Sequence, residues 1–222
     1  MINKSQIWIN QLPDAYVGIL IINNAPNLPA HEALDSARLD LENELRDRFG
    51  SQDRKSLRND PVLAAYDAFY RSFRKTYHVQ LQLESVIFKG KNIFSPSSLV
   101  ACMFMAELKT GLLTAAHDFC SIDFPLNANI ASGEETYLRL DNTEQELKKG
   151  DLYIKDQQGI LSSVIYGPDK RTQIQSNTNR ALYTTYGPPG ISKDQIIDQL
   201  EILEAYVRLF APQAVREELL VV

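Results

Sequence analysis

Apolar and polar positions follow two different periods along the chain, and these periods predict where helices and strands form. The earliest apolar run, residues 16–22, is short and predicts a buried strand. Apolar residues from Leu34 to Phe49 then recur every three or four positions with acidic residues opposite, which predicts an amphipathic helix. The polar stretch 50–59 predicts a mobile surface loop.

Three helices are expected in the middle of the chain. Asp60 followed by Pro61 is typical of an N-cap and a first helical position, and the apolar stripe behind them extends to about residue 77. A second helix is expected over residues 81–89, where a glycine follows. A third, over 99–110, is apolar on nearly every side and should be buried.

Beyond residue 111 the pattern changes to short extended segments. Strands are expected at residues 113–116, 136–140, 151–155, 160–166 and 181–186. Residues 156–159 join two of them as a hairpin turn. Ser192 and Gln195 form a capping box before a final amphipathic helix that packs on the sheet. The pattern predicts an α+β fold, a single compact domain with a mixed or antiparallel sheet flanked by helices.

Composition narrows the classes of function. The 23 Lys and Arg against 28 Asp and Glu give a net charge of −5, so a polyanion would have to meet a local basic patch. Two cysteines are too few for a disulfide framework and suit a reducing compartment. No apolar run is as long as a transmembrane helix, and no signal peptide is evident. We therefore expect a cytoplasmic protein without membrane association.

Familiar chemical motifs are scarce in the sequence. It contains no phosphate-binding glycine loop, nucleotide fingerprint or zinc-ligand pair, so neither a cofactor nor a metal site is expected. A cysteine nucleophile would need Cys120 beside His117, but on an extended strand these side chains point to opposite faces. We interpret Cys120 as an ordinary buried thiol, and His31 and His78 as surface residues.

Basic residues cluster locally despite the acidic total. The clusters are Arg71, Arg74 and Lys75 near one helix end, Lys89 and Lys91 around a glycine, and Lys170 and Arg171 before a loop. These residues are either solvated surface charges that compensate the dipoles at helix C-termini or contacts to the phosphates of one bound nucleic-acid strand.

Residues 100–122 favour the second explanation. Val100, Gly111, Ala116, Asp118 and Ile122 match the pattern V-D-x-x-N, seven residues to a glycine, then x-P-x-H-A-x-D-x-x-x-I. This stretch resembles the editing domain of the phenylalanyl-tRNA synthetase β chain. The segments 83–91, 150–159, 171–179 and 186–189 resemble the freestanding relatives of that domain. We accordingly divide one domain, 1–222, into an N-terminal strand, helix and loop (1–59), an editing-domain-like core (60–210) and a C-terminal tail (211–222).

The resemblance implies a pocket that receives the aminoacylated 3′ end of a tRNA without a cofactor. It implies a trans-acting deacylase that hydrolyses the ester of a mischarged tRNA, with tyrosine or canavanine as the amino acid in relatives. The alternative is a non-catalytic protein that binds tRNA or an amino-acid derivative. A purely structural interaction domain is a third possibility.

The sequence departs from the family at four positions. The aspartate, asparagine, proline and histidine of the family motif correspond to Ala101, Phe104, Leu113 and Ala115. His117 shares a strand face with position 115, so we expect it to take over as the catalytic residue. By the same match, substrate contacts are expected from Ala115, Thr172, Gln173 and Thr178. Contacts to RNA are expected from Lys89, Lys91 and Arg171, with Arg171 at the terminal phosphate.

Overall fold

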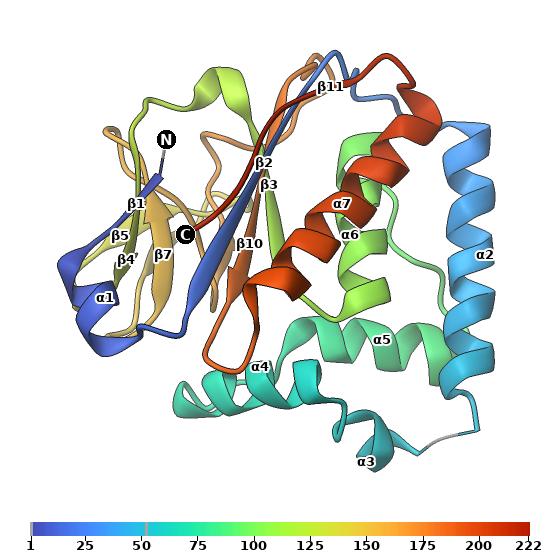
Figure 1. Cartoon of the computed structure of the whole chain (residues 1–222), viewed down its shortest axis with the longest axis horizontal. Helices are drawn as coiled ribbons and strands as arrows, with labels where there is room; N and C mark the ends of the chain where they lie inside the picture. The colour runs from blue at the N-terminus through green and yellow to red at the C-terminus, as the bar shows by residue number, and fades with distance from the viewer. Residues whose placement is uncertain (1, 52) are drawn as a thin grey trace.

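A four-stranded antiparallel sheet lies at the centre of the computed structural model, which describes residues 2–51 and 53–222 (Figure 1). Its strands are β2 (Tyr16–Asn23), β3 (Thr114–Asp118), β10 (Ala181–Gly187) and β11 (Val215–Val221). They run in the order β11-β2-β10-β3. Helices pack on one face of this sheet, and a second sheet lies beyond the other face (Figure 1). The predicted α+β class is confirmed.

The second sheet is mixed and has five strands. They are β1 (Ile2–Lys4), β4 (Leu126–Ile130), β7 (Leu152–Lys155), β8 (Ile160–Ser163) and β9 (Gly167–Pro168), in that order. Only the β1–β4 pair among these is parallel. Strands β5 (Thr136–Leu138) and β6 (Glu144–Glu146) form a separate ribbon. The hairpin turn predicted between β7 and β8 is confirmed, because Asp156 accepts hydrogen bonds from the backbone N–H groups of Gln158 and Gly159.

Capping residues mark several of the helix ends. They are α1 (Gln6–Gln11), α2 (Glu32–Phe49), α3 (Arg54–Leu57), α4 (Pro61–Ser72), α5 (His78–Lys89), α6 (Ser98–Thr110), the 3-10 helix η1 (Phe119–Ser121) and α7 (Lys193–Phe210). Asp60 caps α4 by accepting from two backbone N–H groups. Gly111 ends α6 with φ +82, a left-handed conformation that favours glycine. The Ser192–Gln195 capping box opens α7, as predicted.

Two expectations about elements were wrong, and strand β11 was not predicted. Residues 50–59 are not only loop, because Asp53 caps α3 by accepting from Ser56 N at 2.7 Å; Gln52 lies outside the described residues. Helix α4 ends at Ser72 rather than near residue 77, because Arg74 takes a left-handed φ of +56. Most of the predicted C-terminal tail is strand β11, whose backbone pairs with β2.

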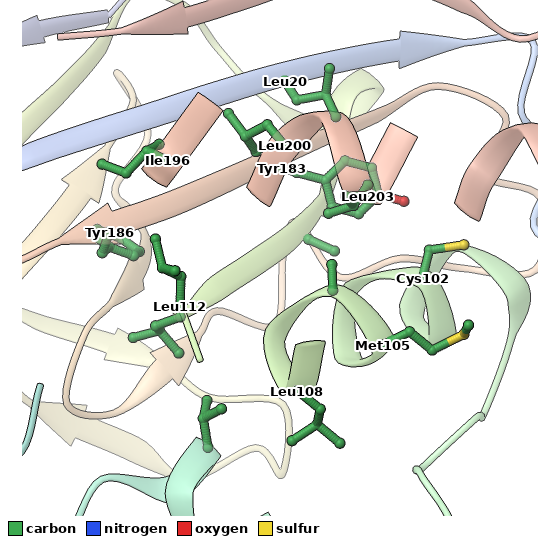
Figure 2. Close-up of a cluster of buried hydrophobic side chains, with 14 of the residues drawn as sticks. Leu20, Cys102, Met105, Leu108, Leu112, Tyr183, Tyr186, Ile196, Leu200 and Leu203 are labelled. Carbon is green, nitrogen blue, oxygen red and sulfur yellow. The ribbon is translucent and has the colours of Figure 1, made fainter. Parts of the chain in front are cut away.

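The core lies between α7, α6 and the central sheet. The apolar face of α7 is fully buried or nearly so at Ile196, Leu200, Leu203, Val207 and Phe210. Figure 2 shows Leu200 and Leu203 beside Leu20 of β2 and Tyr183 of β10, with α6 on the other side. Gly18 permits this approach, since a Cβ there would lie 2.3 Å from Ile196 Cγ2. No helix in the described part of the chain combines the length and hydrophobicity of a membrane span.

Candidate functional site

A cavity of about 790 Å³ opens beside α6. Strand β3, the start of α5, residues 173–176 and Tyr186 also contribute to its wall. Most of the wall is apolar, with Val100, Met103 and Phe104 from one side of α6. A mainly apolar cavity of this size with a few polar groups is typical of a small-molecule site.

The structure separates the predicted substrate-binding residues into two groups. Ala115 and Gln173 line the cavity. His117, Thr172 and Thr178 are buried in the interior and do not contribute to the cavity wall. His117 and Thr172 nevertheless lie together, because His117 Nδ1 is 2.8 Å from Thr172 Oγ1.

His117 lies within a chain of buried hydrogen bonds. Thr172 donates its hydroxyl proton to Asp169, so His117 Nδ1–H must donate to Thr172 Oγ1. His117 Nε2 therefore accepts from Ser162 Oγ at 3.2 Å. The Tyr186 hydroxyl in turn lies 2.7 Å from Ser162 Oγ. Because Tyr186 also lines the cavity, Ser162 connects His117 to the cavity wall.

Burial determines the charge of His117. Desolvation, together with the nearby positive charge of Arg171, lowers the pKa of His117 to about 3. The imidazole is therefore neutral at physiological pH, and both of its nitrogens are engaged in hydrogen bonds. From this position, His117 can orient Ser162 and Tyr186 but does not touch the cavity.

Thr178 supports the loop that borders the cavity. Its hydroxyl donates to Asp118 Oδ2 at 2.8 Å and accepts from Gln175 N at 2.9 Å. Asp118 also accepts from Cys120 N, which starts the short helix η1. Cys120 is exposed rather than buried, because the chain leaves β3 before reaching it.

The structure does not bring the predicted RNA-binding residues together. Arg171 donates to Asp156 Oδ1 at 2.9 Å and to the Ser121 carbonyl at 2.5 Å, so its guanidinium is held by the protein. At the C-terminal end of α5, Lys89 is the last residue of the helix and Lys91 follows it, and both are exposed. That end lies about 16 Å along the helix from His78 at the cavity, from the 1.5 Å rise per residue.

Glu107 is a cavity residue that the sequence analysis missed. Its side chain is 1% exposed, and Oε1 accepts from Thr114 N at 2.8 Å. Oε2 is buried without a hydrogen-bond partner among the described residues. Desolvation raises the pKa of Glu107 to about 8, so the carboxyl is mostly neutral at pH 7. A lone acid on a helix otherwise apolar on nearly every side was the signal available in the sequence.

His78 was predicted at the surface, but it is largely buried and lines the cavity. Its Nδ1 lies 3.1 Å from the Tyr70 hydroxyl, which donates its one proton to the Val164 carbonyl at 2.6 Å. His78 Nδ1 must therefore carry the hydrogen, and Nε2 is left with a lone pair. Burial and the charge of Lys75 lower the pKa of His78 to about 4. Within the described residues, no three His, Cys, Asp or Glu side chains converge as metal ligands would.

Comparison with known proteins finds similarity to phenylalanyl-tRNA synthetase beta subunits in both sequence and structure. No protein-family model matches the chain. Over 79 residues, 36% of this chain, it is 35% identical to the phenylalanine–tRNA ligase beta subunit of Mycoplasma pneumoniae, and the match spans 10% of that protein. A crystal structure of an N-terminal fragment of the phenylalanyl-tRNA synthetase beta-subunit from Pyrococcus horikoshii aligns with a TM-score of 0.48 and 12% identity, over 94% of this chain and 48% of the fragment. The predicted resemblance is confirmed: over part of its length, this chain is related to the phenylalanine–tRNA ligase beta subunit.

Proposed function

We propose that the chain binds the aminoacylated 3′ end of a tRNA in the cavity and hydrolyses the ester of a mischarged tRNA. The observation that carries this proposal is a mainly apolar cavity whose wall holds a neutral imidazole and a carboxyl with one oxygen lacking a partner among the described residues. The relation to a phenylalanine–tRNA ligase beta subunit suggests that the ligand is an amino acid carried by tRNA.

His78 is the side chain best placed to assist this hydrolysis. An aminoacyl ester is already activated, so a water held against the carbonyl carbon needs a group that accepts its proton and returns that proton to the departing 3′ oxygen of the tRNA. The unoccupied Nε2 of His78 can do this from the cavity wall. Its low pKa makes it a weak base, but one that remains unprotonated throughout the physiological range. His117 then acts as a positioning residue, through Ser162 and Tyr186.

Contacts to the body of the tRNA are proposed at the exposed lysines. Lys89 and Lys91 are free of ion pairs within the described residues, whereas Arg171 is held by Asp156. With a net charge of −5, such contacts give a weak affinity that falls as salt rises.

A panel of mischarged tRNAs tests the proposal by release of free amino acid. His78→Gln should reduce hydrolysis of the preferred substrate about 10²-fold, because the proton acceptor is lost. His31→Gln is the matched control, since His31 lies at the start of α2 and does not line the cavity. Parental activity in His78→Gln would remove His78 from the reaction. Release from no tRNA in the panel would refute deacylation.

The second candidate is a non-catalytic protein that binds tRNA or an amino-acid derivative. It is favoured by Ala101, Phe104 and Ala115 at family polar positions, and by His117 lying away from the cavity. A gel shift with aminoacylated and uncharged tRNA, run beside the release assay, distinguishes this candidate from the deacylase. Binding of charged tRNA without release of amino acid would establish this candidate in place of the deacylase.

A further inference from the structure

Glu107 has an oxygen that the protein itself does not satisfy. Oε2 is buried and has no hydrogen-bond partner among the described residues, while Oε1 is occupied by Thr114 N–H. A buried carboxyl oxygen without a partner is costly whether it is protonated or ionised, and native structures rarely leave one unless water, a ligand or another group completes it. Glu107 also lines the cavity, so a molecule bound there can reach it.

The neighbouring donors are already used. Burial raises the pKa values of Tyr66, Tyr70 and Tyr77, so these phenols stay protonated. A negative charge on Glu107 would raise the same pKa values further, because the three phenols lie near its carboxyl. Each phenol gives its one proton to a backbone carbonyl, at Tyr186, Val164 and Gly111 respectively. His78 spends its N–H on Tyr70. None of these groups is free to donate to Oε2, so a molecule bound in the cavity can supply the donor.

We infer that Glu107 Oε2 receives the amino group of the bound molecule, so that the cavity takes α-amino esters with apolar side chains. This inference rests on the proposed function, which supplies the ester. The cavity wall contains no lysine or arginine among the described residues, so a ligand ammonium would be the only cation beside the carboxyl. The titratable groups of that region, His78, Tyr186 and the three phenols, carry no positive charge at pH 7. The apolar side of α6 accommodates the side chain.

Binding of such a ligand must release a proton. In the free protein Glu107 holds a proton below pH 8, because its carboxyl is desolvated. A positively charged ammonium placed against it favours the carboxylate, and the displaced proton leaves to solvent. Affinity for a ligand whose α-ammonium is charged should therefore rise about tenfold for each pH unit between pH 5 and pH 7.

Calorimetry with L-phenylalaninamide tests the inference without tRNA or hydrolysis. Titrations at pH 6.5 in two buffers of different ionisation enthalpy give the number of protons released, which should be close to one. The matched probe 3-phenylpropanamide lacks only the amino group, and it should release none. Glu107→Gln keeps the shape and the acceptor for Thr114, and it should abolish proton release and weaken L-phenylalaninamide about tenfold or more.

Two results would overturn the inference. One is binding of L-phenylalaninamide without proton release in the parental protein, a measurement that does not depend on any variant folding. The other is equal affinity of L-phenylalaninamide and 3-phenylpropanamide. Proton-linked binding in a protein that hydrolyses no mischarged tRNA would support the inference and refute only the deacylase. Hydrolysis of mischarged tRNA that is unchanged in Glu107→Gln would support the deacylase and refute the inference about Glu107.

Discussion

Replacing Glu107 by glutamine should leave the stability of the protein nearly unchanged at low pH. As pH rises, the parental protein should become less stable than Glu107→Gln. Glutamine retains the oxygen that accepts from Thr114 N, but it cannot ionise. At pH 5 the parental carboxyl is already neutral in the folded protein, so the two proteins should differ little there.

The magnitude follows from the raised pKa of Glu107, about 8 in the folded protein against an ordinary value of 4.5. Between these values the folded protein holds a proton that the unfolded chain has lost. The stability contributed by the neutral acid is therefore fully present below pH 4.5 and is lost as pH rises through 8. Each pH unit changes the free energy of unfolding by about 1.4 kcal/mol. From pH 5 to pH 8 the parental protein should lose about 4 kcal/mol relative to Glu107→Gln.

Urea unfolding at pH 5, 6.5 and 8, followed by far-UV circular dichroism, measures this difference. The raised pKa of Asp151 acts in the same direction as Glu107, and the lowered pKa values of His78 and His117 act in the opposite one. All three residues are present in both proteins, so their contributions cancel in the comparison. A difference that stays constant from pH 5 to pH 8 would show that Glu107 is ionised in the folded protein and would refute the reasoning.

Three further predictions concern packing and RNA contact. Leu203→Ala should destabilise the protein by about 2–5 kcal/mol in urea unfolding, while Leu209→Ala, at an exposed position, should cost less than about 0.5 kcal/mol. Equal losses would mean that the buried face of α7 is misassigned. Gly18→Ala should cost about 1–3 kcal/mol by the same measurement, because the new Cβ would overlap Ile196 and Leu200; parental stability would show that α7 moves away freely. Lys89→Gln with Lys91→Gln should weaken tRNA binding and flatten its salt dependence in filter binding, and an unchanged slope would exclude both lysines from the interface.

Several helix ends could be predicted because their signals are local. Asp60 before Pro61, Gly111 and the Ser192–Gln195 box each fix a helix end by contacts within a few residues, and the structure has each of them. Strand partners could not be predicted in this way, because β2 pairs with segments that lie far along the sequence. Strand β11 was missed because its first residues are charged and exposed, and only backbone pairing with β2 orders them.

The candidate site was predicted only in part, for a similar reason. The strand period placed Ala115 and His117 on one face, and the family match added Gln173; of these three, Ala115 and Gln173 line the cavity. The alternation of side chains along a strand does not show where the cavity ends. His117 lies outside the cavity, in contact with Ser162 of β8. Placing His78 and Glu107 together required knowing that α5 and α6 meet the same cavity, which depends on tertiary packing.

The central sheet has a consequence for synthesis of the protein on the ribosome. Strand β2 is made early and presents six consecutive buried residues, yet its partner β10 begins about 160 positions later. At about 5–20 residues per second, this strand waits roughly 10–30 s for its first partner. During that interval its apolar side chains and unpaired backbone are exposed to other chains. The helices α2, α4, α5 and α6 are made within the interval, so they are the segments of this chain available to shield β2 until β10 and β11 arrive.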